Sequence, residues 1–477
     1  MVIKSDASAD ALVASPCSDV VGGDDAPKRT VDNDMQVSQD VCSQDESINK
    51  NLVKYGELII LGTLRFASES GKLTHSRFSR IQADFGPSLY NGHLPNGDRG
   101  RRRSKFVLYK RNVPNGVKRS KHYVVRTPHS TQAILNTEQH SISYTMSRNQ
   151  AVIVEYTHDE NTDMFQIGRS SEPPIDFVVL DTVAGDKNKT DNKVLASTIS
   201  RFACRILCDR HNPSIARIYA AGFDSSKNIF LGEKATKWET GHDMDGLTTN
   251  GVLIMHPHGC FSDGNATYGT WREVSIGGAI YSLRASRSAP VKGNSVEGVT
   301  NILQDGTLID LCGATLLWRT VEGLKKSPTK EYLEGLVDKL NADRPVCPVG
   351  LNTLVIPRRS NMEHNLQQPY VYLSCGHVQG HHDWGLNKDS NFRTCPMCLK
   401  VGRAVKLYMG IEQAFYVDCG PPVFFAFDPC GHMATEKTVK YWAQISIPHG
   451  TSGFEAFCPF CATLLENVPG YVRLIFN

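Results

Sequence analysis

The sequence predicts a mostly β protein, in which an antiparallel β-sandwich precedes a small α+β module built around two metal ions. Short apolar runs separated by turn residues follow one another through the middle of the chain, and no long amphipathic pattern precedes residue 329. Four closely spaced Cys/His pairs then gather near the C-terminus. Strands at this spacing favour a sandwich, and 477 residues are enough for two or three domains.

The N-terminal 50 residues differ in composition from the rest of the chain. They hold ten acidic and four basic side chains with hardly any periodic apolar pattern, so we expect a disordered acidic tail. No secretory apolar region begins the chain and no run of about 18 apolar residues occurs, so no membrane span is expected. Clustered cysteines without a secretory leader indicate a reducing compartment, and we expect a cytoplasmic protein.

The first predicted strand covers residues 55–62, an apolar run that ends at glycine. Residues 63–89 show neither the strand nor the helix period and are interpreted as an insert. Residues 97–126 contain eleven Lys or Arg and one Asp, a charge that could neutralise nucleic-acid phosphates or serve as a localisation signal. Because no aromatic platform for base stacking is interleaved, a solvated strand rim is the favoured interpretation.

The sequence also predicts a loop, a linker helix, the domain bounds and ten further strands. Composition predicts a hairpin loop at residues 224–228. Residues 330–340 form an amphipathic linker helix with Leu333, Leu336, Val337 and Leu340 on one face. The expected domains are the sandwich at 51–325, the linker at 326–344 and the metal module at 345–477. Further strands are expected at 151–156, 164–167, 176–180, 202–207, 216–220, 229–231, 251–255, 271–276, 280–283 and 315–318.

The Cys/His pairs predict two zinc ions. A Cys-x-His or Cys-x-x-Cys pair on a tight turn can supply half of a tetrahedral site, so eight ligands make two closed, structural sites. Sequential sharing of the pairs would give two Cys₃His sites, whereas interleaved sharing would give one Cys₂His₂ and one Cys₄ site. The residues alone leave this choice open. The ligands are Cys375, His377, Cys395, Cys398, Cys430, His432, Cys458 and Cys461.

Other residues could enter the same chemistry. Cys347, His381 or His382 could replace one ligand. Cys419 is the best unpaired candidate for carrying a covalent intermediate, but no neighbouring base or acidic pattern suggests activation. A free structural thiol is therefore the favoured interpretation of Cys419.

Three loop signals in the strand-rich region point to an anion. Gly168-Arg169-Ser170 follows a strand, Ser200-Arg201 opens another, and Thr249-Asn250-Gly251 precedes a third. An arginine fork with hydroxyl and amide donors from neighbouring loops suits one phosphate dianion. Each signal is weak alone because such dipeptides are common in turns, but their order is more specific.

This loop series resembles the forkhead-associated (FHA) fold, whose loops bind phosphothreonine. Together with the zinc pairs and runs such as YGELIILG, STISRFACRI and CPVGLNTL, it is similar to the Pellino family of ubiquitin ligases over nearly all of residues 54–477. The resemblance implies an FHA-like domain, extended by a wing that includes much of the basic region, and a RING-like zinc domain. It also favours interleaved zinc pairing.

The resemblance assigns residue roles by motif. Arg169 would clamp the phosphate, Ser200 would bond to it, and Thr249 with Asn250 would hold the phosphopeptide; Arg201 is adjacent. The chain departs from the family pattern at two places. Ala203 stands where many FHA domains have histidine, and the 63–89 insert interrupts a nearly continuous join.

The function implied is a RING-type E3 ubiquitin ligase that orients a ubiquitin-conjugating enzyme and its ubiquitin. Met397, Trp442 and Phe460 could contact that enzyme, although core packing explains them equally well. Family likeness implies phosphorylated IRAK/Pelle-type kinases of Toll and interleukin-1 receptor innate immune signalling as partners. The alternatives are a non-catalytic phosphothreonine-binding scaffold and a basic nucleic-acid-binding zinc protein. The latter is disfavoured because a long β region separates the basic cluster from the zinc pairs.

Overall fold

The computed structural model describes residues 52–61, 105–126, 139–179, 198–241, 243–357, 367–387, 392–420, 424–449 and 453–476. The chain divides into the units Met1–Leu52 and Val53–Asn477, and the account below concerns the second. The expected acidic tail at 1–50, the 63–89 insert and the arginines between 99 and 103 lie outside the described residues. The described residues are mostly β with predominantly antiparallel sheets, which confirms the predicted fold class.

The largest sheet has seven strands, all paired antiparallel. One pair of this sheet joins the first strand of the sandwich to its last strand, with Leu58 opposite Trp318. The sandwich therefore closes on its own N-terminal strand. In spatial order the strands are β15 (Ile280–Tyr281), β14 (Arg272–Val274), β13 (Leu253–Met255), β16 (Leu308–Asp310), β17 (Thr315–Thr320), β1 (Lys54–Ile60) and β2 (Lys105–Tyr109).

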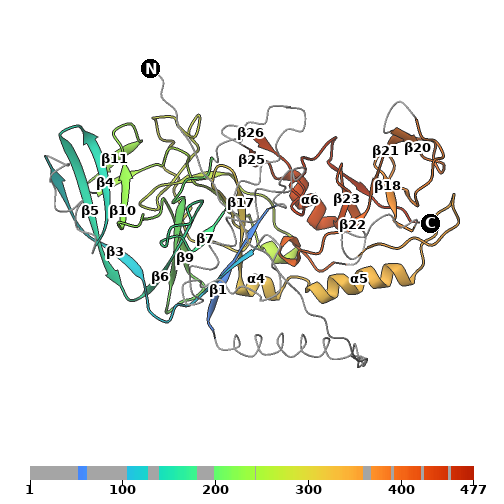
Figure 1. Cartoon of the computed structure of the whole chain (residues 1–477), viewed down its shortest axis with the longest axis horizontal. Coiled ribbons are helices and arrows are strands. Elements are labelled where there is room, and N and C mark those ends of the chain that lie inside the picture. Colours follow the sequence, from blue (N-terminus) through green and yellow to red (C-terminus); the bar gives the residue numbers. More distant parts are fainter. Residues whose placement is uncertain are drawn as a thin grey trace, which may run out of the picture. The chain divides into compact units, whose positions relative to one another are not determined.

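Three smaller sheets complete the sandwich region (Figure 1). One has the order β7 (Phe177–Val178), β6 (Thr162–Gly168), β8 (Cys204–Asp209) and β9 (Ala216–Ala220). The second has the order β10 (Asn228–Leu231), β4 (His140–Ser147), β5 (Gln150–Asp159) and β3 (Gly116–Val125). The third pairs β11 (Lys237–Thr240) with β12 (Asp243–Gly246), and a short 3-10 turn, η3 (Phe261–Asp263), follows β13.

The seven-stranded sheet is buried on both faces. In β1, Leu58 and Ile60 belong to a first core shared with the smaller sheets, whereas Ile59, with Leu61 just after the strand, belongs to a second core shared with the C-terminal half. Successive strand residues point to opposite faces, so a strand covered on both sides needs a continuous apolar run. This explains why β1 is apolar throughout its second half.

The C-terminal half contains two four-stranded sheets and one hairpin. The first sheet has the order β19 (Val378–Gln379), β18 (Tyr370–Tyr372), β21 (Val401–Lys406) and β20 (Phe392–Thr394). The second has the order β22 (Tyr408–Met409), β24 (His432–Thr435), β23 (Phe424–Phe427) and β27 (Tyr471–Arg473). The hairpin joins β25 (Ile447–His449) to β26 (Gly453–Glu455); the described helices are α4 (Val321–Lys325), α5 (Lys330–Ala342) and α6 (Glu436–Gln444), with a 3-10 turn, η4 (Gln413–Phe415).

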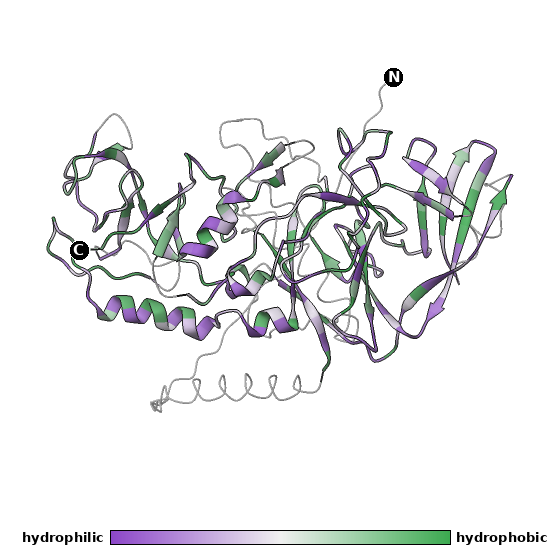
Figure 2. Cartoon of the chain, turned by 180° about the vertical axis from the view of Figure 1, so that it is seen from behind, coloured by the Kyte–Doolittle hydropathy of each residue, from purple (hydrophilic) through white to green (hydrophobic). Residues whose placement is uncertain are grey.

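Helix α5 confirms the predicted linker helix, with bounds two residues longer at its C-terminus. The Thr329 side chain caps it by accepting from the Tyr332 N–H. Leu333, Leu336 and Val337 are buried in the second core, and Figure 2 shows the alternating apolar and polar faces. The helix is therefore packed along its length and is not a free spacer.

Polar and aromatic contacts accompany the shared second core. Trp271 Nε1 donates to the Ser446 carbonyl at 2.8 Å, and Arg319 donates to the Ala414 carbonyl. The rings of Phe261 and Tyr441 meet edge to face with centroids 5.4 Å apart. The sandwich and the C-terminal half thus pack as one unit through the outer face of the seven-stranded sheet.

Two sequence predictions need correction. Residues 224–228 do form a turn, in which Asp224 N donates to Asn228 O, but not a hairpin loop. Strand β10 leaves the sheet of β9 and pairs parallel with β4, a strand missing from the predictions. Within the basic region, β3 agrees with a solvated rim, because Lys118, Arg119 and Lys121 are exposed, whereas Arg111 pairs with Asp176 and is largely buried.

Candidate functional site

The first Cys/His cluster forms between the two hairpins of one sheet. Cys375 and His377 lie on the turn from β18 to β19, and Cys395 and Cys398 lie on the turn from β20 to β21. Their ligand atoms all lie within 4.8 Å of one another. Glycine is required at Gly376, where φ is +83° and an added Cβ would come within 1.9 Å of the Arg473 carbonyl.

The second cluster repeats this arrangement. Cys430 and His432 lie on the turn from β23 to β24, and Cys458 and Cys461 lie on a turn closed by the Phe457–Leu464 bridge. These four ligand atoms also lie within 4.8 Å of one another. The Nδ1 atom of His432 is buried without a hydrogen-bond partner among the described residues. A buried imidazole nitrogen without a partner, on a residue grouped with three thiols, fits a metal ligand.

The pairs are therefore grouped sequentially into two Cys₃His clusters, and the interleaved grouping implied by the RING resemblance is wrong for this chain. The reason is topological. In the first cluster the two turns belong to strands of the same sheet, since β18 pairs with β21 and β21 pairs with β20. Neighbouring strands bring the two ligand pairs together, whereas interleaving would require each ion to join different sheets.

The surroundings of the cluster cysteines shift their thiol pKa values in both directions. The backbone N–H of Lys400 lowers the pKa of the Cys398 thiol, and hydrogen bonds from Cys430 and Cys458 lower that of Cys461. Burial raises the pKa of Cys375 to about 12, so in the absence of a cation this thiol keeps its proton. Three sulfurs and one imidazole suit a closed tetrahedral zinc site.

Gln379 is a polar residue that the sequence did not single out. Its side chain is fully buried, and Nε2 donates to the Cys395 sulfur at 3.5 Å. Its Oε1 accepts from His382 Nε2 at 2.8 Å. His382 therefore supports the first cluster from outside and is not one of its ligands.

The other candidate residues do not join either cluster. Cys347 is buried on a turn like those of Cys395 and Cys458, with its N–H bonded to the Asn352 carbonyl, but Gly350 stands where a second cysteine would be. His381 lies against the Tyr370 ring. Burial and the Asp418 charge raise the pKa of Cys419, which opposes the thiolate that a covalent intermediate would need.

The three anion-binding loop signals do converge. Gly168 lies against the backbone of Arg201, where an added Cβ would come within 2.0 Å of the carbonyl. The Arg169 N–H donates to the Ser200 carbonyl and the Ser170 N–H to the Arg201 carbonyl. Asn250 Nδ2 donates to the Thr198 carbonyl at 2.6 Å and to Ser200 Oγ at 3.2 Å. We call segments 168–170, 198–202 and 248–251 the phosphate loops.

These contacts fix how the side chains are oriented. Arg169 Nε donates to the Ile199 carbonyl at 2.7 Å, which leaves its two terminal nitrogens without partners among the described residues. Because the Thr198 carbonyl can only accept, the Asn250 nitrogen must face it, and Ser200 Oγ in turn accepts from Asn250. The Ser200 hydroxyl hydrogen and the Asn250 carbonyl oxygen remain available for a ligand.

The flanking positions differ in exposure. Thr249 is exposed at the loop tip, and Arg201 is exposed with its guanidinium 3.7 Å from Glu172. Ala203 is buried, and its backbone bonds to Ile167 and Ala221 connect neighbouring strands without the histidine found in many FHA domains. Two buried arginines beneath the loop 248–251, Arg284 and Arg287, were missed because their short sequence segment reads as an ordinary basic turn.

Of the three residues expected to contact the conjugating enzyme, two are packed inside the module and one is exposed. Trp442 is fully buried and donates from Nε1 to the Phe415 carbonyl, so it cannot touch a partner in this structure. Phe460 is partly buried, and its ring stacks on His432 with centroids 5.8 Å apart. Met397 is 47% exposed at the tip of the first Cys-x-x-Cys turn. Core packing therefore explains Trp442 and Phe460, and only Met397 stays a candidate.

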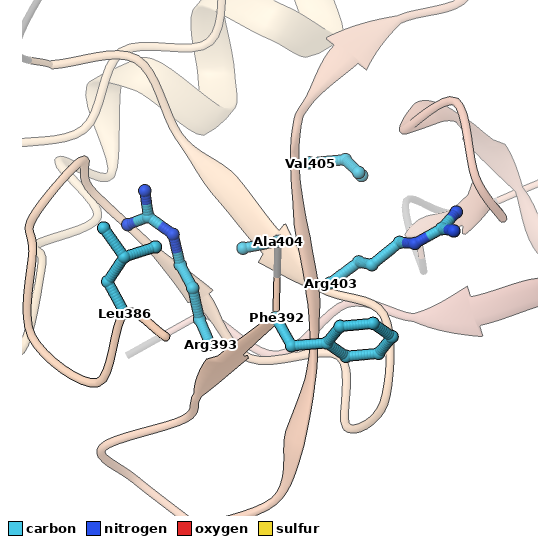
Figure 3. A pocket seen from close by; sticks show the side chains of 6 residues that line it. All are labelled: Leu386, Phe392, Arg393, Arg403, Ala404 and Val405. Carbon is cyan, nitrogen blue, oxygen red and sulfur yellow. The ribbon is translucent and has the colours of Figure 1, made fainter. Parts of the chain in front are cut away.

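Exposed apolar side chains surround Met397 on the hairpin of β20 and β21. Phe392, Leu399 and Val401 are 43%, 70% and 62% exposed. Of these side chains, Phe392 also lines a hollow of about 570 Å³, which has Leu386, Arg393 and Arg403 on its wall (Figure 3). Apolar patches of this kind on a small module mark interaction surfaces.

Among the described residues, no helix has the length and apolar character needed to cross a membrane.

Comparison with known proteins covers most of the chain. Residues 88–336 match the family model "Pellino, FHA domain" and residues 340–477 match "Pellino, RING domain". The chain is 63% identical to "Protein pellino" of Drosophila melanogaster over 90% of this chain and 94% of that protein. It is 56% identical to the human "E3 ubiquitin-protein ligase pellino homolog 2" over 90% of this chain and 96% of that protein. The human "E3 ubiquitin-protein ligase pellino homolog 3" is 52% identical over 91% and 92%, respectively. With this identity along nearly its whole length, the chain belongs to the Pellino family of E3 ubiquitin-protein ligases.

Proposed function

We propose that this ubiquitin ligase selects its targets by binding phosphothreonine at the phosphate loops. The observation that carries the proposal is the orientation of Asn250. Its nitrogen is used within the protein, so its carbonyl oxygen can accept a peptide N–H, while Ser200 donates to the phosphate. The free fork of Arg169 supplies two further charge-assisted donors.

The targets we propose are phosphorylated IRAK/Pelle-type kinases, with a role in Toll and interleukin-1 receptor signalling. Family membership supports this partner class, and the three phosphate loops supply the chemistry for a phosphorylated partner. A cytoplasmic location suits such kinases, and the described cysteines are all free thiols, as in a reducing compartment.

Zinc is the metal we propose for both Cys₃His clusters. Bound there, it would fix the two turns of each cluster and take no part in chemistry, because all four positions are filled by protein ligands. Ligase activity then depends on holding the conjugating enzyme, its ubiquitin and the target lysine together. This module supplies the docking surface and no nucleophile.

We assign the docking of the conjugating enzyme to Met397 and the exposed apolar side chains around it. The turn carrying Met397 is anchored by Cys395 and Cys398, so the tip is held rigidly while its side chain stays in solvent. A rigid apolar anchor loses little entropy on binding. Leu351, 79% exposed on the similar turn after Cys347, offers a matched exposed residue outside the patch.

Two measurements test the proposal. Arg169→Ala should abolish binding to phosphothreonine peptides without changing zinc content, whereas Arg148→Ala, exposed on the β4–β5 turn, should bind normally. Unchanged affinity in Arg169→Ala would show that the phosphate pocket is wrongly placed. With ubiquitin, activating enzyme and a panel of conjugating enzymes, Met397→Ala should form few chains and Leu351→Ala normal amounts; the reverse result would exclude the Met397 surface.

A further inference from the structure

Two buried ion pairs lie directly beneath the phosphate loop 248–251. Arg284 and Glu273 are each 2% exposed, with Nε 3.0 Å and Nη2 2.6 Å from the two carboxylate oxygens. Arg287 is 9% and Asp310 2% exposed, and these side chains are also in contact. Removing two charges from water costs free energy that their mutual attraction does not always offset. Two buried ion pairs under one short loop therefore point to a role beyond stability.

Each arginine directs a remaining donor at the loop backbone. Arg284 Nη2 donates to the Thr248 carbonyl at 2.7 Å, and Arg287 Nη1 donates to the Asn250 carbonyl at 3.1 Å. The carbonyls on both sides of Thr249 are therefore fixed from below. Gly251 allows this approach, since φ is +68° and an added Cβ would come within 2.7 Å of Glu273 Oε1.

The same network reaches the neighbouring phosphate loop. Asp310, the partner of Arg287, accepts from the Cys312 N–H at 2.9 Å, and the Cys312 carbonyl accepts from the Thr198 hydroxyl. The Thr198 carbonyl in turn accepts from Asn250. The two loops are thus connected through Asp310 and Cys312 as well as through Asn250.

We propose that Arg284 and Arg287 are positioning residues of the phosphothreonine site. This rests on the proposed function. Both guanidinium groups are buried and committed to carboxylates and carbonyls, so they do not bind phosphate themselves. They hold Thr249 and Asn250 in the conformation that accepts the peptide, which lowers the entropy lost on binding.

A lysine substitution separates positioning from general stability. Arg287→Lys keeps a positive charge for Asp310 but loses the fork that also reaches the Asn250 carbonyl. Loss of one hydrogen bond that orders the loop should weaken binding of a phosphothreonine peptide about 5- to 10-fold. Arg284→Lys should act similarly through Thr248.

Inorganic phosphate provides the discriminating probe. It needs only Arg169 and Ser200, whereas a peptide also needs Thr249 and Asn250. We would measure the affinity of a labelled phosphothreonine peptide and the inhibition constant of inorganic phosphate competing with it, using the full chain. Arg287→Lys should lower the affinity for the peptide and leave the inhibition constant of inorganic phosphate unchanged. Arg210→Lys, in a buried pair with Asp163 at the far end of β8, is the matched control and should change neither.

The outcomes are distinguishable. If the Arg284 and Arg287 variants bind peptide as the wild type does while Arg169→Ala does not, the positioning role is wrong and the phosphothreonine site stands. If Arg210→Lys weakens peptide binding equally, the effect is general destabilisation and the inference fails. If Arg169→Ala itself binds normally, the proposed function fails together with this inference.

Discussion

Replacing Arg319 should strongly destabilise the protein, because this one side chain joins the sandwich to the C-terminal half. It lies on β17 with no exposed side-chain surface. It donates to Asp305, to the hydroxyls of Ser262 and Ser327 and to the Ala414 carbonyl. Its guanidinium also stacks 4.6 Å above the Phe261 ring.

Arg319→Ala removes one member of a buried pair and leaves Asp305 without its charge partner. Such changes cost about 3–5 kcal/mol of the free energy of unfolding. Asp305→Ala leaves Arg319 unpaired in the same way. The double variant contains neither orphaned charge, so its loss should be smaller than the sum of the single losses by about 1–3 kcal/mol.

Urea denaturation followed by tryptophan fluorescence measures these differences. Arg148→Ala, fully outside the network, should stay within about 0.5 kcal/mol of wild type. Hydrogen exchange adds a local readout, since residues 411–417 should exchange faster in Arg319→Ala while β5 changes less. A loss below about 1 kcal/mol, or unchanged exchange at 411–417, would refute the idea that Arg319 fastens the two halves.

Three further predictions follow from other sites. Burial and the charges of Lys227 and Arg205 lower the pKa of His140 to about 4. Between pH 6.5 and 4, His140 is therefore protonated in the unfolded chain but largely neutral in the folded chain, so acid favours unfolding. Over this pH range, the free energy of unfolding should fall by about 2 kcal/mol more in wild type than in His140→Gln. Equal pH dependence in urea titrations would contradict this. Chelating the metal should lower the melting temperature of the sandwich as well as of the C-terminal half, because both share the second core. If calorimetry shows the same melting temperature for the sandwich with and without chelator, the two halves are not coupled in stability. Gln379→Leu should speed metal release from the first cluster about 10-fold, measured with a chromogenic chelator, while the second cluster serves as internal control. Equal acceleration at both clusters would mean a global effect.

Local patterns were enough to find the eight residues of the two Cys/His clusters, because two residues on one tight turn can point toward the same position. Their grouping was not predictable, since it depends on which hairpins share a sheet, and that is decided by long-range pairing such as that of β18 with β21. The strand β10 illustrates the same limit. Its sequence predicts a strand, but nothing local says that it leaves β9 to pair in parallel with β4.

Burial was equally hard to predict for single side chains. Trp442 and Met397 are both large apolar residues near metal ligands, yet one is fully buried and the other 47% exposed. Helix α6 supplies the difference, since it turns Trp442 toward the Phe415 carbonyl, whereas Met397 is one of only two residues between Cys395 and Cys398 on a tight turn. Arg284 and Arg287 show the converse case, in which exposed-looking basic residues prove to be buried and paired.

If the phosphate loops bind the target as we propose, the seven-stranded sheet connects target binding to ubiquitin transfer. The phosphate loop 248–251 leads directly into β13, and Leu253 and Met255 of that strand are buried in the core shared with the C-terminal half. On this proposal, a packed sheet and not a flexible linker sets the distance from the phosphothreonine at these loops to the conjugating enzyme at the Met397 surface. The target's own chain must span that distance, and the span of a flexible chain grows only as about 5–6 Å times the square root of its length. Peptides with one phosphothreonine and one lysine at increasing separations should therefore be ubiquitinated at rates that rise sharply beyond a minimum spacing and then decline slowly. Equal initial rates of ubiquitination at every spacing would show that the two halves move independently, and would contradict the rigid packing inferred from the shared core.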